Sequence, residues 1–125
     1  MRILLSLLLV SPLSYSQINP KNIDIVRDEY GIPHIYAQTD AEVAYGLAWA
    51  NAEDDFTTIQ EAYLAGNAML SNYIGLKGAA ADFITQFIGS KNLIEEKIGT
   101  ISEDYMAVVE GYSQGLNAYA SNNPD

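Results

Sequence analysis

The sequence predicts an α+β fold in which one β-hairpin is followed by helices. Three observations support this prediction: two short apolar segments flank a glycine-containing turn, a helix-capping pattern follows them, and apolar residues then recur at spacings of three and four. The chain has 125 residues, of which 49% are hydrophobic and 18% are charged. This size and composition are typical of a single globular unit and differ from those of disordered chains.

Residues 1–16 have the order of a secretory signal peptide. A short positive start precedes the apolar stretch Ile3–Val10, and Ser14 and Ser16 place small residues three and one positions before a cut ahead of Gln17. The apolar stretch is shorter than the roughly 20 residues of a membrane span, and a buried core helix is the alternative. We therefore expect residues 17–125 to be periplasmic or secreted and free of the membrane after signal removal.

A β-hairpin is predicted directly after the signal. Residues 23–28 alternate weakly between apolar and polar, and residues 32–36 form a second short apolar run. The turn between them, residues 28–31, contains Gly31, which can adopt a positive φ. Pro33 has no amide donor and therefore belongs at an edge or at the start of its strand.

A long helix is predicted to begin after Thr39. Thr39 and Glu42 fit a capping box, in which each side chain satisfies an amide of the first turn. The helix should end between Gly66 and Gly75, and its alanine-rich first half is thin enough to approach a neighbouring backbone closely. Spacings of three and four predict a buried stripe on it: Val43, Leu47, Ala50, Ala52, Phe56, Ile59 and Tyr63.

Two later helices are predicted. One covers residues 79–88, with Phe83, Ile84, Phe87 and Ile88 as its apolar positions. The other begins after Ser102, a favourable N-cap followed by two acidic residues, and ends at Asn122-Asn123-Pro124. Its apolar positions again recur at spacings of four and three: Tyr105, Val109, Tyr112, Leu116 and Tyr119.

The charge and the rare residue types exclude several function classes. The 16 acidic and 6 basic side chains give a net charge of −10, whereas binding to nucleic acid requires clustered Lys and Arg. The absence of cysteine excludes disulfides, thiol catalysis and cysteine zinc sites. His34 is the only histidine, so a site with several histidine ligands is excluded.

Four features invite a chemical interpretation, and for each we prefer a structural one. Glu53-Asp54-Asp55 suggests calcium, but consecutive helical residues point about 100° apart, so we expect a solvated face with one buried, paired carboxylate. His34 could be a general base, although a histidine in a hairpin more often bonds locally. Gly89-Ser90 could release an N-terminal serine nucleophile, but a helix-ending glycine and a capping serine explain it better. The nine tyrosines suggest carbohydrate stacking, but Tyr105, Tyr112 and Tyr119 share a helix face, so we expect most tyrosines to pack in the core.

Four segments of the chain resemble, in order, blocks of the penicillin acylase family's α chain. They are Ile25–Ala37 with its Arg-Asp-Glu-Tyr-Gly-Ile-Pro-His-Ile run, Tyr45–Asp54 closing on Ala-Glu-Asp, Ala81–Phe83, and Glu110–Tyr119 with its Gly-Tyr-x-x-Gly-x-Asn pattern. The similarity covers nearly all of residues 23–124. The second and fourth blocks lean weakly toward the acyl-homoserine lactone and aculeacin acylase branch. Asp55 stands where many penicillin acylases have Arg.

This resemblance implies a fold, a reaction and a partner. The fold is the layered αββα arrangement of N-terminal-nucleophile hydrolases, of which residues 17–125 would be an incomplete part. Such enzymes are exported precursors cut into α and β chains, and the new N-terminal serine of β attacks the amide of a small acyl-amide substrate. The implied partner is the β chain of the same precursor. No catalytic, cofactor-binding or metal residue is therefore assigned in this chain, although calcium is possible in the full-length enzyme.

The resemblance also suggests a structural role for two matched residues, and it leaves rival functions open. We expect Arg27 to pair with Asp54 and so to join the hairpin to the first long helix. The main alternative function is a non-enzymatic, exported helical binding module derived from an acylase fragment. An autonomous hydrolase using Ser90 or His34 is a further alternative.

Overall fold

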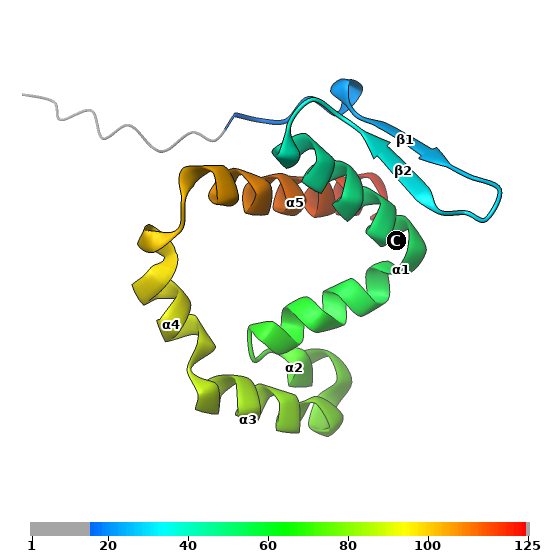
Figure 1. Ribbon diagram of the computed structural model, residues 1–125. Coiled ribbons are helices and arrows are strands. Elements are labelled where there is room, and N and C mark those ends of the chain that lie inside the picture. Colours follow the sequence, from blue (N-terminus) through cyan, green and yellow to red (C-terminus); the bar gives the residue numbers. More distant parts are fainter. Residues whose placement is uncertain (1–15, 125) are drawn as a thin grey trace, which may run out of the picture.

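The computed structural model describes residues 16–124, so the predicted signal peptide lies outside the described residues except for Ser16. A hairpin lies against the first half of one long helix, which packs on the last helix, while the helices between them form an open arc (Figure 1). The elements in chain order are η1 (Pro20–Asn22), β1 (Asp24–Arg27), β2 (Pro33–Tyr36), α1 (Asp40–Gly66), α2 (Leu70–Ile74), η2 (Gly75–Gly78), α3 (Ala79–Ile88), α4 (Ser90–Lys97), η3 (Ile98–Thr100) and α5 (Glu103–Asn122).

The predicted hairpin is confirmed. Strands β1 and β2 pair antiparallel, with Ile25 opposite Ile35, and β2 begins at Pro33. Gly31 has a φ of +80° and donates to the Asp28 carbonyl at 3.0 Å, which closes the turn. Ile25 and Ile35 point toward Gly46 of α1, where an added Cβ would lie 2.7 Å from Ile35 Cγ2. The hairpin therefore sits directly on the backbone of α1.

Helix α1 begins as predicted and is broken once. The Thr39 hydroxyl accepts from the Glu42 amide at 3.3 Å, and the Glu42 carboxylate accepts from the Thr39 amide at 3.1 Å, which completes the capping box. The helix ends at Gly66, within the predicted interval. At Asp55, however, φ of −159° and ψ of 79° interrupt the helix, which the apolar periodicity did not predict. After this break the second half of α1 turns away from α5 (Figure 1).

The contact between α1 and α5 is made by small residues. A Cβ added to Gly111 would clash with the Ala41 carbonyl group, and one added to Gly115 would lie 2.9 Å from Ala48 Cβ and still closer to the Tyr45 carbonyl oxygen. The close backbone approach predicted for a thin helix is therefore confirmed. The predicted stripe is confirmed at Ala50 and Ala52, which are buried, and is wrong at Val43, Leu47 and Tyr63, which are exposed. Four further buried residues of α1 lie outside the predicted stripe: Ala44, Tyr45, Gly46 and Ala48.

Aromatic side chains extend this contact at the break in α1. The Tyr119 ring meets Trp49 edge-on at 5.5 Å and Phe56 at 5.2 Å, both measured between ring centroids. The expectation that most tyrosines pack in the core is wrong, because only Tyr45 is buried among the described tyrosines. The exposed ones are Tyr30, Tyr36, Tyr63, Tyr73 and Tyr105.

The arc from α2 to α4 combines a confirmed helix with an unpredicted one. Helix α3 has the predicted bounds and ends at Gly89, which has a left-handed φ of +71°. Helix α4 starts at once with Ser90, because Gly89 reverses the chain without a linker. Ser90 makes no side-chain cap, so its predicted capping role is wrong. The apolar side chains of α3, predicted as packing positions, are exposed: Phe83, Ile84, Phe87 and Ile88.

The described residues thus contain the hairpin and helices of the predicted α+β class. The complete αββα arrangement would require further strands, and residues 16–124 form one two-stranded sheet. None of the helices within these residues has the length and hydrophobicity needed to span a membrane.

We expect Gly111→Ala to lower the free energy of unfolding of the protein by about 1–3 kcal/mol, because its methyl group would force α5 away from the Ala41 carbonyl. Urea unfolding monitored by circular dichroism measures this loss. Gly66→Ala is the matched control, because nothing lies within 4 Å of a Cβ added there. Equal stability of the two variants would show that the helices do not need this close approach.

Candidate functional site

Arg27, the last residue of β1, makes polar contacts with both the hairpin turn and α1. Its guanidinium contacts Asp54 Oδ1 at 2.9 Å and Glu53 Oε2 at 3.2 Å. It also donates to the carbonyl oxygens of Gly31 at 2.8 Å and Ala50 at 3.3 Å. One side chain therefore joins the hairpin turn, the strand and α1. The predicted pairing with Asp54 is confirmed, and the hydrogen bond to Glu53, followed by that to Asp54, raises the pKa of Arg27.

The break at Asp55 explains how the three consecutive acids are used. Glu53 and Asp54 both face Arg27, and Glu53 also accepts from Trp49 Nε1 at 2.9 Å. Asp55 accepts from the Thr58 hydroxyl at 2.6 Å and from the Thr58 amide at 3.0 Å, as an N-cap does for the helix that restarts there. These Thr58 hydrogen bonds lower the pKa of Asp55.

The expectation of a buried carboxylate in this acidic run is wrong, because Glu53, Asp54 and Asp55 are all exposed. They pair with a cation and a helix end rather than with a metal. In residues 16–124, no group of three or more Asp, Glu or His side chains is placed to hold a metal ion.

His34 bonds locally, as expected for a histidine in a hairpin. Its Nε2 lies 3.2 Å from Asp28 Oδ2 across the turn. Asp28 also accepts from the amides of Tyr30 and Ile32, both at 2.9 Å. The hydrogen bond with His34, ahead of these backbone bonds, lowers the pKa of Asp28. His34 therefore stabilises the turn.

The structure does not bring His34 and Ser90 together. His34 lies in β2 and Ser90 begins α4, and the two elements lie on opposite sides of the arc in Figure 1. Ser90 and His34 therefore do not form a nucleophile–base pair with each other.

Asp82 is a structural residue that sequence reasoning did not identify. It is only 5% exposed, and its carboxylate accepts from the amides of Leu70 and Ser71, both at 2.8 Å, at the start of α2. Hydrogen bonds from Ser71, more than that from the Leu70 amide, lower the pKa of Asp82. A signal for this role was present, because an acidic residue follows three alanines on the most apolar of the short helices.

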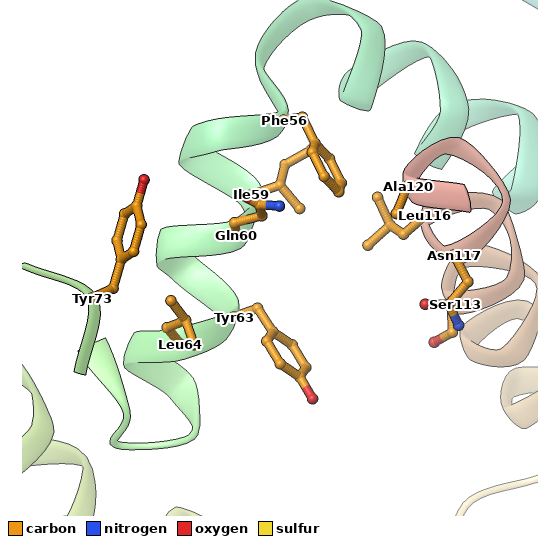
Figure 2. Close-up of a pocket in the computed structure, with 10 residues that line it drawn as sticks. All are labelled: Phe56, Ile59, Gln60, Tyr63, Leu64, Tyr73, Ser113, Leu116, Asn117 and Ala120. Carbon is orange, nitrogen blue, oxygen red and sulfur yellow. The ribbon is translucent and has the colours of Figure 1, made fainter. Parts of the chain in front are cut away.

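A groove of about 630 Å³ lies between the second half of α1 and α5. Figure 2 shows Phe56 of α1 directed toward Leu116 and Ala120 on the facing helix. Apart from tyrosine hydroxyls the lining contains no titratable group, so the groove offers apolar surface rather than acid–base chemistry. Its lining residues are Phe56, Ile59, Gln60, Tyr63, Leu64, Tyr73, Ser113, Leu116, Asn117 and Ala120.

Comparisons with known proteins agree on one family. A family model described as penicillin amidase matches residues 22–125. Penicillin G acylase of Escherichia coli is 30% identical over 97 residues, which are 78% of this chain and 12% of that protein. Acyl-homoserine lactone acylase PvdQ of Pseudomonas putida is 26% identical over 96 residues, 70% of this chain and 12% of that protein. The chain thus spans about an eighth of the length of these relatives.

The fold is also found in a solved structure. The chain is similar to thermostable penicillin G acylase from Alcaligenes faecalis, with a TM-score of 0.72 and 24% sequence identity. The similarity covers 82% of this chain and 56% of that chain. At this identity the comparison supports the fold alone, and within that fold the described residues contribute the hairpin, the Arg27 cluster and the paired helices.

We expect Arg27→Ala to lower the thermal midpoint of the protein, because the hairpin loses its link to α1. Arg27→Lys should recover only part of the loss, since an ammonium group cannot reproduce the forked contacts with Glu53 and Asp54. Lys21→Ala removes an exposed cation that has no ion pair among the described residues, and it should leave the thermal midpoint unchanged. An unchanged thermal midpoint in Arg27→Ala would refute a structural role for this cluster.

Asp82 should make stability depend on pH. Because its pKa is lower in the folded chain than the ordinary value of 3.8, its contribution is complete above that value and is lost as the pH falls below it. In Asp82→Asn, thermal melting should therefore show a lower midpoint near neutral pH and a smaller further drop below about pH 4. Asp24→Asn, which removes an exposed carboxylate in β1, serves as the control. Parallel midpoint curves for Asp82→Asn and the unmodified protein would contradict this assignment.

Proposed function

Because the chain belongs to the penicillin amidase family over residues 22–125, we propose that it is the N-terminal part of an exported acylase precursor. The proposed enzyme hydrolyses a linear amide bond between an acyl group and an amine, such as those of penicillins, acyl-homoserine lactones or lipopeptide side chains. The continuous match of nearly the whole described chain, in sequence and in fold, is the observation that supports this proposal.

The chemistry of the proposed enzyme resides in the β chain of the same precursor. The serine that becomes N-terminal on processing attacks the amide carbonyl carbon, while its own α-amine takes the hydroxyl proton. Backbone or side-chain donors stabilise the oxyanion, and water then releases the acyl group. In residues 16–124, the polar clusters around Arg27, Asp28 and Asp82 are engaged in holding the fold, which is consistent with a supporting role.

Exposed apolar side chains support the presence of a covering partner. Phe87 is 82% exposed and stacks on Phe83, with ring centroids 6.1 Å apart on the outer face of α3. A continuous apolar surface of this kind is costly in water and is typical of an interface. We assign the remainder of the precursor, including the β chain, as the polypeptide that covers it. The exposed apolar residues of α3 and α4 are Phe83, Ile84, Phe87, Ile88, Leu93 and Ile94.

The test is amide hydrolysis by the protein expressed from its complete reading frame in an export-competent host. We expect the purified, processed protein to release the amine from at least one substrate in a panel of phenylacetyl amides, penicillins and acyl-homoserine lactones. Replacing the serine at the start of the β chain with alanine should reduce hydrolysis to background. Ser90→Ala is the matched control and should retain full activity. Lack of hydrolysis across the panel, or activity lost with Ser90, would refute the proposal.

A further inference from the structure

A second pocket, of about 440 Å³, lies where the N-terminal segment crosses the start of α1 and the middle of α5. Its walls come from three parts of the chain. Ser16 and Gln17 line it from the N-terminal segment, Glu42 from α1, and Glu110 and Gln114 from α5. The peptide bond between Ser16 and Gln17, at which the signal peptide is predicted to be cut, therefore lies at a pocket that contains two carboxylates.

Hydrogen bonds hold the N-terminal segment in this position. The Ile18 amide donates to Gln114 Oε1 at 3.0 Å. The other end of the same side chain, Gln114 Nε2, donates to Glu110 Oε1 at 3.3 Å. Gln114 therefore connects the backbone next to Gln17 to the carboxylate of Glu110.

The two carboxylates of the pocket differ in how well they are satisfied. Glu42 accepts hydrogen bonds from the amides of Gln38 and Thr39, from the Thr39 hydroxyl and from Asn22. Glu110 is partly buried, and within residues 16–124 it has one neutral donor, Gln114, and no ion pair. No Lys, Arg or His lines the pocket. A partly buried carboxylate without a cation favours a positively charged neighbour.

We propose that cleavage ahead of Gln17 supplies this cation, so that the new α-ammonium group of Gln17 pairs with Glu110. Before cleavage the nitrogen of Gln17 belongs to a neutral peptide bond, and after cleavage it is an amine that is largely protonated at neutral pH. The ion pair therefore exists only in the processed chain, where it anchors the mature N-terminus to α5. The proposal depends on the cleavage position and not on the acylase activity.

The proposed pairing has a chemical consequence that can be measured. An N-terminal glutamine can cyclise: its uncharged amine attacks the side-chain carbonyl carbon, the bond to the side-chain nitrogen breaks, and ammonia leaves. A protonated amine has no free electron pair and cannot attack. Pairing with Glu110 should therefore keep Gln17 open by favouring the charged amine.

The test uses the exported, purified protein and follows its N-terminal peptide by mass spectrometry during incubation at neutral pH. We expect the purified chain to begin at Gln17. Its N-terminal glutamine should lose ammonia about two- to fivefold faster in Glu110→Gln than in the unmodified protein, because the variant lacks a partly exposed ion pair. Glu61→Gln is the matched control, because Glu61 is also partly buried but does not line the pocket. A different first residue, or equal rates in the unmodified protein and in Glu110→Gln, would overturn the proposal.

A second measurement covers the case in which Glu110→Gln is not exported. In the unmodified protein, an amine-acylating reagent should modify the Gln17 α-amine about two- to fivefold more slowly in the folded than in the urea-unfolded state. The exposed Lys21 side chain is the internal reference. Equal relative labelling in the two states would refute the pairing. Neither readout uses hydrolysis, so this result is independent of the proposed enzymatic function.

Discussion

The approach of α5 to the backbone of α1 is the constraint on which the rest of the fold depends. Because Gly111 and Gly115 lie against the carbonyl groups of Ala41 and Tyr45, the two helices pack with little side-chain volume between them. Such a contact is geometrically specific but buries little apolar area per residue, so it contributes modestly to stability. The buried hydrophobic residues among those described are small apart from one: Ala44, Tyr45, Ala48, Ala50 and Ala52. This small core is consistent with the proposal that the described residues pack against further polypeptide in the complete protein.

The break at Asp55 links this core to the exposed arc. Up to Asp54, α1 belongs to the core, and its last carboxylates hold the hairpin through Arg27. Asp55 then restarts the helix in a new direction, and the groove opens between the redirected half and α5. The Arg27 cluster and the groove therefore lie on either side of the same feature, the break in α1 at Asp55. The groove and the exposed side chains of α3 are two apolar surfaces of the described residues.

Local sequence signals predicted the hairpin and the helices α1, α3 and α5, but not the short helices α2 and α4. The capping box at Thr39, the turn at Gly31 and the cap at Ser102 were identified because each depends on neighbouring residues. Periodicity identified only Ala50 and Ala52 of the buried face of α1, since it weights large apolar side chains, whereas the contact with α5 requires small ones. It also missed the break at Asp55, because a spacing of three and four describes one continuous helix and does not mark an N-cap inside it. The cap that Asp82 provides to α2 depends on tertiary contacts.

Sequencing the reading frame beyond the codon for Asp125 decides whether the chain is part of an acylase precursor. In such a precursor the frame stays open for several hundred codons and encodes a cut site followed by a serine that becomes the N-terminus of a second chain. That serine would identify the nucleophile, and the second chain would supply the surface that covers α3 and the groove. A stop codon directly after Asp125 would contradict the account, and binding assays would then be the appropriate test of function.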